Sequence, residues 1–282
     1  MKTYVLYNSK SNNSSGAADA EQLKTVWSGR ELTFTDVLTL ESYDEFFKGL
    51  APDDEVCLCG GDGTLNYFVN ATDCEAIKNK VYYYPTGSGN DFWNDLNKKK
   101  GDAPVQINKY LTGLPTVTVN GKTSKFINGI GYGIDGYCCE EGDRLKEKSD
   151  KPINYTSIAI KGLLFRYKPT NAEVEVDGKS FTFKKAWLAP TMKGRFYGGG
   201  MMATPHQNRL DPEKNVTCMV MNGAGKLRTL IAFPAIFKGE HVKKSIVHVM
   251  KGKHVRVRFD RPVALQIDGE TVLNVTEYEV NV

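Results

Sequence analysis

The chain has 282 residues, of which 40% are hydrophobic and 25% are charged, a balance typical of folded globular proteins and not of disordered or fibrous ones. This length is enough for two domains, each with its own core. The formal net charge of +4 favours anionic partners such as nucleotide phosphates or acidic lipid head groups, and we expect no nucleic-acid binding because the sequence has no dense basic patch.

The first third of the chain alternates between strand-like and helix-like spacing of its apolar residues. The expected strands are residues 2–7, 32–37, 55–59 and 81–84. The expected helices are residues 17–27, 42–50 and a segment that begins near Leu65. Strands that alternate with helices predict a parallel sheet covered by helices, and we place this α/β domain at residues 1–114.

From about residue 115 the pattern changes to paired extended segments. Asn120-Gly121, Asp177-Gly178 and Asp268-Gly269 lie between alternating segments and predict tight β-hairpins. The other expected strands are residues 174–176, 181–183, 216–221, 255–259 and 263–267, and the expected helices are 154–166 and 227–237. We predict a mainly antiparallel second domain at 115–282, in which any return of the last residues to the first domain is very short.

The sequence contains no segment that we expect to cross a membrane. The longest apolar stretch, residues 153–167, is interrupted by polar side chains and is shorter than the roughly 20 residues that span a bilayer. The N-terminal segment lacks the long apolar core of a secretory signal. The six cysteines form no CxxC pair, which favours reduced thiols over disulfides or a zinc site. We therefore predict a cytoplasmic protein.

A glycine-rich turn, Gly60-Gly61-Asp62-Gly63-Thr64, lies between a predicted strand and a predicted helix. Glycines let backbone N–H groups approach an anion, and the N-terminus of a helix adds a partial positive charge, so this turn can hold a phosphate. Thr64 can cap the helix or donate to a phosphate oxygen. Asp62 beside a phosphate calls for a cation such as Mg²⁺. The alternative is a tight turn that binds no ligand.

A second glycine turn, residues 85–92, also follows a predicted strand and precedes a predicted helix. In a parallel sheet such turns gather at the carboxyl ends of the strands, where ligands bind. We therefore expect the two glycine turns to lie at one edge of the sheet. The alternative is that Asn90 or Asp91 only caps a helix after a loop.

Several motifs together resemble those of the diacylglycerol kinase catalytic domain family, which includes bacterial lipid kinases and sphingosine kinases. In chain order they are residues 60–64 with Asn66, 85–92, 128–135 (NGIGYGID), 198–201 (GGGM) with Pro205, and 266–270 (QIDGE). The resemblance covers nearly the whole chain. It implies an α/β nucleotide-binding domain like those of NAD kinases and phosphofructokinases, followed by a β-sandwich. It also implies an ATP-dependent kinase that phosphorylates a hydroxyl of diacylglycerol or a related lipid alcohol at the cytosolic membrane face.

The resemblance assigns roles to individual residues. The implied nucleotide-binding residues are Asn8, Lys10, Ser11, Gly60, Gly61, Asp62, Gly63, Thr64, Thr86, Gly87, Ser88, Gly89 and Asn90. Asp268 accepts the proton of the substrate hydroxyl, and Glu270 helps to orient that hydroxyl. The implied metal ligands, for Mg²⁺, are Asp62, Asp91 and Asp211. Without the resemblance, Asp268-Gly269 is simply a type I′ hairpin turn.

Two segments depart from the family pattern. The first phosphate loop reads Asn8-Ser9-Lys10-Ser11, where the family usually has Asn-Pro followed by Ser-Gly, and the first glycine here is Gly16. The Asp-Asp-Gly that usually follows the fourth motif, and helps to hold a structural metal, is reduced to Asp211.

Two other functions stay open from the sequence. One is an NAD kinase-like small-molecule kinase, because the GGDGT motif is shared, although residues 85–91 and the terminal Asp-Gly-Glu argue against it. The other is a nucleotide-binding regulatory protein without transfer activity, which the altered first loop would permit. The sequence does not identify the lipid, and it leaves the oligomeric state open, a homodimer included.

Overall fold

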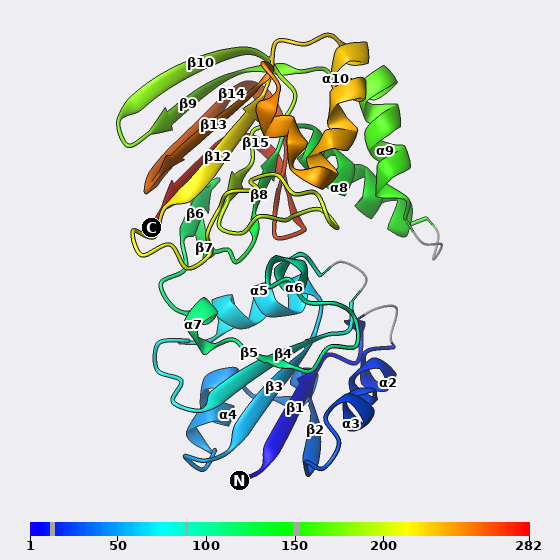
Figure 1. Cartoon of the computed structure of the whole chain (residues 1–282), viewed down its shortest axis with the longest axis vertical. Coiled ribbons are helices and arrows are strands. Elements are labelled where there is room, and N and C mark those ends of the chain that lie inside the picture. Colours follow the sequence, from blue (N-terminus) through cyan, green and yellow to red (C-terminus); the bar gives the residue numbers. More distant parts are fainter. Residues whose placement is uncertain (12–14, 88–89, 149–152) are drawn as a thin grey trace. The chain divides into compact units, whose positions relative to one another are not determined.

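The computed structural model describes residues 1–11, 15–87, 90–148 and 153–282. These residues form two compact units, Met1–Leu114 and Pro115–Val282 (Figure 1). In the ranges just given, no helix has both the length and the apolar character needed to cross a bilayer.

The first unit is an α/β domain, as the alternation of the sequence predicts. Its sheet has the order β2-β1-β3-β4-β5. The strands are β1 (Thr3–Tyr7), β2 (Leu32–Asp36), β3 (Glu55–Gly60), β4 (Lys80–Pro85) and β5 (Val105–Gln106). The first four are parallel, and only the short β5 runs antiparallel to β4. Every residue of β3 is buried, as expected for the centre of a covered parallel sheet.

Short helices cover this sheet. They are α2 (Gly16–Glu21), α3 (Leu23–Val26), η1 (Val37–Thr39), α4 (Tyr43–Lys48), α5 (Asp62–Ala71), α6 (Asp91–Asp95) and α7 (Asn108–Leu111). Both α2 and α5 pack against β3. The apolar residues that predicted α5 are its buried face, namely Leu65, Phe68 and Val69. The α4 helix begins where Ser42 Oγ accepts a hydrogen bond from the Glu45 backbone N–H at 3.1 Å, a typical N-cap.

The second unit is antiparallel, as predicted. Its strands are β6 (Thr116–Val119), β7 (Lys122–Lys125), β8 (Gly129–Tyr132), β9 (Thr170–Val176), β10 (Lys179–Ala186), β11 (Thr191–Met192), β12 (Val216–Met221), β13 (Val247–Gly252), β14 (His254–Ile267) and β15 (Glu270–Asn281). The long strand β14 pairs with β8, β9 and β15, and all of these pairings are antiparallel. A large apolar core lies beneath it, in which the ring of Tyr132 stacks on that of Phe259 with centroids 3.9 Å apart.

Helices accompany this sheet in three segments. They are α8 (Ile134–Lys146), α9 (Tyr155–Lys161) continued by the π-helical η2 (Gly162–Arg166), and α10 (Lys226–Ala232) continued by η3 (Phe233–Lys238) and η4 (Glu240–Lys243). In Figure 1, α9 and α10 lie side by side. The predicted helices at 154–166 and 227–237 are confirmed, whereas α8 was not predicted.

The three predicted hairpins are confirmed. Their strands pair across the turns as Val119 with Lys122, Val176 with Lys179 and Ile267 with Glu270. Asn120, Asp177 and Asp268 have φ of 49°, 47° and 47°, and the glycine after each also has a positive φ. Positive φ at both central residues defines the type I′ turn and matches the twist of the flanking strands.

One expectation in this unit was wrong. The sequence predicted separate strands at 255–259 and 263–267, but β14 runs through both segments. Its register with β15 shifts between Arg258 and Val263. The intervening residues include Pro262, which has no backbone N–H for a regular ladder, so the chain crosses this point as a bulge and does not end the strand.

Candidate nucleotide and catalytic sites

Three loops of the first unit start at the same edge of its sheet. Tyr7 at the end of β1 lies opposite Cys59 of β3, and Gly60 at the end of β3 lies opposite Pro85 of β4. The loops that begin at Asn8, Gly61 and Thr86 therefore gather at the carboxyl ends of parallel strands, as expected. This edge is where open α/β sheets bind ligands.

The first loop is a compact turn. The Asn8 carbonyl accepts hydrogen bonds from Ser11 N at 3.0 Å and Ser11 Oγ at 2.7 Å, and Asn8 Oδ1 accepts from Lys10 N at 2.9 Å. Gly16 packs directly against it, since a Cβ on Gly16 would lie 1.9 Å from the Asn8 carbonyl oxygen. The late glycine thus has a steric function in the loop. Lys10 is exposed.

In the second loop, Gly60 is required by contact with Thr64. A Cβ on Gly60 would lie 2.3 Å from Thr64 Oγ1. The Gly60 carbonyl accepts from the buried Tyr83 hydroxyl at 3.0 Å and from Thr86 N at 3.1 Å. The loop leads through Gly61 into the N-terminus of α5, where Gly63 is exposed. Exposed backbone at the start of a helix suits an anion.

Asp62 connects the two glycine turns. Its carboxylate accepts from Asp91 N at 2.7 Å and from Phe92 N at 3.0 Å, so it caps the start of α6 from the neighbouring loop. The turns also touch directly, because a Cβ on Gly87 would lie 2.9 Å from Gly61 Cα. Asn90 Nδ2 closes the second turn by donating to the Gly87 carbonyl at 2.7 Å. Two other expected binding residues, Ser88 and Gly89, lie outside the described residues.

The expected metal ligands separate into two places. Asp62 and Asp91 are neighbours at the sheet edge of the first unit. Two adjacent carboxylates fit Mg²⁺, which typically binds one or two carboxylates, several waters and substrate phosphates. Over the ranges that the structure covers, no three His, Cys, Asp or Glu side chains form a complete protein-only metal site. An ion at this edge would therefore need phosphate oxygens as further ligands.

Asp211, the third expected ligand, belongs to the second unit and has an ammonium partner. Lys251 Nζ lies 2.7 Å from Asp211 Oδ2, and Asn215 Nδ2 donates to the same oxygen at 3.1 Å. The hydrogen bond from Lys251 is the main reason that the pKa of Asp211 is lowered to about 2. A cation of the chain itself thus neutralises this carboxylate.

A cavity of about 440 Å³ borders the second glycine turn. Thr86 and Gly87 form part of its wall, and Trp93 and Asn94 of α6 form another part. Polar side chains of α2 and the loop after α6 complete the lining, namely Asp19, Gln22 and Lys100. A cavity of this size is within the range of small-molecule sites. The sequence gave no reason to select Asp19 or Gln22, and Lys100 was read as part of a solvated lysine run.

In the second unit, three of the matched motifs meet around Asn128. The carboxylate of Asp268 accepts from the backbone N–H groups of Ile127 at 2.7 Å, Asn128 at 2.8 Å and Gly129 at 2.9 Å. Arg209 donates to the Ile127 carbonyl and, at 2.8 Å, to Asn128 Oδ1. Residues separated by 81 to 141 positions are therefore fixed to one short turn.

The two expected catalytic carboxylates differ in their surroundings. Asp268 is 8% exposed and its hydrogen bonds anchor the β14–β15 turn to the start of β8. Glu270, on the other side of the same turn, is exposed. Gly269 N donates to the buried Gln266 Oε1 at 2.6 Å, which further fixes the turn. The structure therefore holds one carboxylate rigidly and leaves the other accessible to solvent.

Asp135 is a further buried carboxylate, in the first turn of α8. The Tyr197 hydroxyl donates to Asp135 Oδ2 at 2.7 Å. Burial raises the pKa of Asp135 to about 7, although the hydrogen bond from Tyr197 opposes the shift. Asp135 ends a motif that the sequence singled out, but no role was assigned to it, and nothing in the sequence pairs it with Tyr197.

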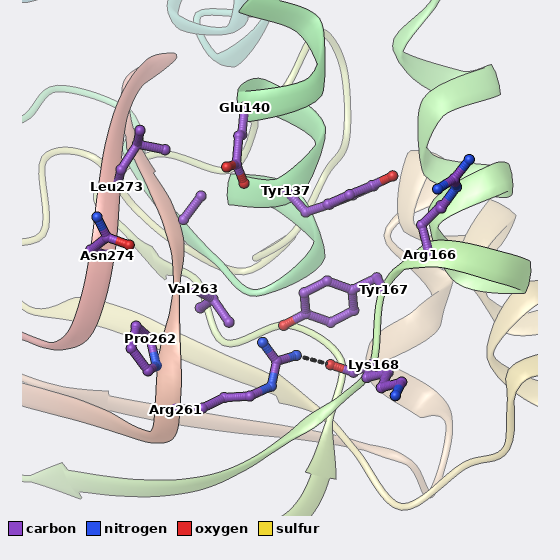
Figure 2. Close-up of a pocket in the computed structure, with 11 residues that line it drawn as sticks. Tyr137, Glu140, Arg166, Tyr167, Lys168, Arg261, Pro262, Val263, Leu273 and Asn274 are labelled. Atoms are coloured by element: carbon purple, nitrogen blue, oxygen red, sulfur yellow. Dashed lines mark hydrogen bonds between the residues drawn. The ribbon is translucent and has the colours of Figure 1, made fainter. Parts of the chain in front are cut away.

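A second cavity, of about 460 Å³, lies in the second unit (Figure 2). Arg166, Lys168 and Arg261 contribute cationic side chains to its lining, and Glu140 contributes a carboxylate. Arg261 donates to the Lys168 carbonyl and lies over the Tyr167 ring, with 5.6 Å between the guanidinium carbon and the ring centroid. The lining is thus predominantly basic.

Comparison with known proteins agrees with this architecture. The family model of the diacylglycerol kinase catalytic domain matches residues 2–119, and that of the YegS C-terminal NAD kinase beta sandwich-like domain matches residues 128–279. A diacylglycerol kinase from Bacillus anthracis str. Sterne has a similar fold, with a TM-score of 0.60 at 17% identity over 99% of this chain and 93% of that chain.

Curated relatives carry the same description at low identity. A diacylglycerol kinase of Bacillus subtilis (strain 168) is 26% identical over 223 residues, which cover 77% of this chain and 71% of the relative. A diacylglycerol kinase of Mycobacterium tuberculosis (strain ATCC 25618 / H37Rv) is 26% identical over 211 residues, which cover 72% of this chain and 66% of the relative. The two domain matches in order, and these relatives, show that the chain belongs to the diacylglycerol kinase-like family of kinases.

Proposed function

We propose that this protein transfers the γ-phosphoryl group of ATP to a hydroxyl of a lipid, diacylglycerol or a related lipid alcohol. The observation that carries the proposal is the joined pair of glycine turns at one sheet edge, held together by Asp62 in front of the α5 N-terminus. Because such an acceptor resides in a membrane, we place the protein in the cytoplasm with peripheral contact to the inner membrane face.

The nucleotide is bound by the first unit in this proposal. Backbone N–H groups of residues 8–11 and 60–64 hold the phosphates, and the turn from Thr86 to Asn90 holds the rest of the nucleotide beside the 440 Å³ cavity. Lys10, which is exposed, supplies a positive charge to the phosphates. Asp62 and Asp91 would hold Mg²⁺ together with the phosphates, and the ion would neutralise the charge of the transferring group.

The transfer itself needs an in-line hydroxyl and a place for its proton. The hydroxyl oxygen bonds to the γ-phosphorus as the bond to the ADP oxygen breaks, and a carboxylate accepts the hydroxyl proton. We assign the proton to Asp268 and the orientation of the hydroxyl to Glu270. No covalent enzyme intermediate is required.

ADP release tests this function. The purified protein is incubated with ATP, Mg²⁺ and, separately, diacylglycerol, ceramide, a sphingoid base, a polyprenol and NAD. We expect turnover with one of the lipids, and loss of rate with retained ATP affinity in Asp268→Asn and Glu270→Gln. Turnover of NAD alone would identify a small-molecule kinase. ATP binding without turnover of any acceptor would identify a regulatory protein.

The two carboxylate variants need a control for folding, because Asp268 anchors backbone groups. Circular dichroism and ATP affinity are measured for both variants, and Glu279→Gln, an exposed carboxylate elsewhere on β15, serves as the matched variant. An unchanged rate in a folded Asp268→Asn protein would remove Asp268 as the base.

A further inference from the structure

Four large apolar side chains of the second unit lie on its surface in two neighbouring helical segments. Phe165 of η2 is 75% exposed, and Ile231 and Leu227 of α10 are 71% and 68% exposed. Ile160 at the end of α9 is 41% exposed. We call these four residues the α9–α10 surface. Single exposed apolar residues are common, but several close together mark an interaction site.

The two segments form one surface because they are joined. Lys226 Nζ at the start of α10 donates to the Leu164 carbonyl of η2 at 2.8 Å, which places the residues next to Phe165 and Leu227 in contact. Figure 1 shows α9 and α10 side by side. Leu227 and Ile231 are four residues apart and share a helix face, whereas Thr229 and Ala232 are buried.

The charge of these segments is entirely positive. Residues 153–168 contain Lys161, Arg166 and Lys168, and residues 225–238 contain Lys226, Arg228 and Lys238, and neither segment contains Asp or Glu. The whole chain has a formal charge of only +4, so the concentration of six cations here is specific to these segments. An acidic partner surface is therefore complementary to this part of the molecule.

The basic cavity of Figure 2 continues this surface along the chain. Arg166 and Lys168 follow Phe165 directly, and both line the cavity together with Arg261. A group with a negative charge that enters from beside Phe165 would meet these side chains. Apolar residues next to a cationic recess match the order of acyl chain and phosphate in a phospholipid.

We propose that the α9–α10 surface docks on an anionic lipid bilayer. Phe165, Leu227 and Ile231 enter the boundary between head groups and acyl chains, while the flanking cations contact lipid phosphates. This is the way in which interfacial helices bind, by apolar burial added to attraction from anionic lipid. The docking specifies how the protein of the proposed function reaches a lipid acceptor, but it needs no phosphoryl transfer, so the two can fail separately.

Vesicle co-sedimentation tests the docking. The full chain is mixed with phosphatidylcholine vesicles, with and without phosphatidylglycerol, at low and high salt. We expect binding to the anionic vesicles alone, weakened by salt, and a loss of roughly tenfold or more in affinity for Phe165→Ser/Ile231→Ser. Arg166→Gln/Lys168→Gln should weaken binding to anionic vesicles and reduce its salt dependence.

Controls separate docking from folding, catalysis and self-association. Leu38→Ser removes a side chain that is 51% exposed in the first unit and should bind vesicles like the parent protein. ATP affinity of each variant reports the fold of the first unit, and circular dichroism reports the second. Equal vesicle binding by the parent protein and Phe165→Ser/Ile231→Ser overturns the proposal. So does a change of these variants from dimer to monomer without any change in vesicle binding.

Discussion

A single buried carboxylate organises the turn that carries both proposed catalytic residues. Asp268 accepts three backbone hydrogen bonds, from Ile127, Asn128 and Gly129, and has the positive φ that a type I′ turn requires. It therefore has a structural function whether or not it also accepts a proton. Substitutions here affect folding and chemistry together, and the two must be measured separately.

We predict that Asp268→Ala lowers the free energy of unfolding by about 2 to 4 kcal/mol, because it leaves buried N–H groups without their acceptor and places alanine at a positive φ. Urea unfolding followed by circular dichroism measures the change. Glu270→Ala, an exposed position on the same turn, should change stability by less than about 0.5 kcal/mol. Equal stability of the two variants would show that the anchor contributes nothing.

Asp135 predicts a pH dependence of stability. Burial raises its pKa from 3.8 to about 7 in the folded protein, so the folded state holds a proton that the unfolded chain releases. The stabilisation is complete below the unfolded value and is lost as the pH rises through the folded value. Between pH 4 and 7 the contribution to the free energy of unfolding falls by up to about 1.4 kcal/mol per pH unit.

Asp135→Asn tests this dependence, since the amide still accepts a hydrogen bond from Tyr197 but does not titrate. Urea titrations at several pH values should give a shallower fall for the variant than for the parent protein. Parallel curves would mean that Asp135 holds no additional proton in the folded state.

At the scale of elements, the first phosphate loop and the helix behind it are fitted together by one glycine. A Cβ on Gly16 would lie 1.9 Å from the Asn8 carbonyl oxygen, a contact that requires backbone movement. We predict that Gly16→Ala weakens ATP binding about tenfold or more by displacing this loop, with a smaller effect on the fold. Isothermal titration calorimetry measures the affinity. Ala17→Ser, at the exposed next residue, should bind ATP normally, and normal binding by Gly16→Ala would contradict the role of the loop.

Local chemistry explains which elements the sequence predicted. The hairpins depend on two residues each, because only Asn, Asp and Gly readily adopt the positive φ of the type I′ turn. The α8 helix was missed because Gly136 and Gly142 lie within it and its core-facing pattern is short. The Gly136 site has almost no space, since a Cβ there would lie 1.9 Å from the Ala264 carbonyl oxygen. Packing against β14 thus overrides the low helix propensity of glycine.

The same distinction applies to the candidate sites. That the glycine turns share an edge follows from strand order alone, which the alternation of the sequence predicts. Their connection through Asp62 to the start of α6 depends on the distance between two loops, which no local pattern contains. The contact of Arg209 with Asn128 joins residues 81 positions apart in an irregular segment, and no spacing in the sequence signals it.

At the scale of the whole molecule, each of the two units has its own buried core. Each also has its own tryptophan reporters, since Trp27 and Trp93 belong to the first unit and Trp187 to the second. A ligand that binds one unit stabilises that unit by an amount set by its concentration and affinity. The location of the nucleotide site can therefore be read from which reporter responds.

We predict that ATP with Mg²⁺, at about one hundred times its dissociation constant, stabilises the first unit by about 2.7 kcal/mol. In Trp187→Phe the fluorescence comes from the first unit, and its urea midpoint should rise with nucleotide. The same measurement without nucleotide controls for the substitution. An unchanged midpoint at saturating nucleotide would place the binding site elsewhere.

The ion pair between Asp211 and Lys251 has a consequence for the conditions under which the second unit keeps its shape. A side-chain ammonium is covalently attached, so it is always present at one equivalent and cannot be removed by a chelator or exchanged for another ion. The segment around Asp211 should therefore be insensitive to the supply of divalent ions in its surroundings. In this corner of the molecule, the genome encodes the counter-ion.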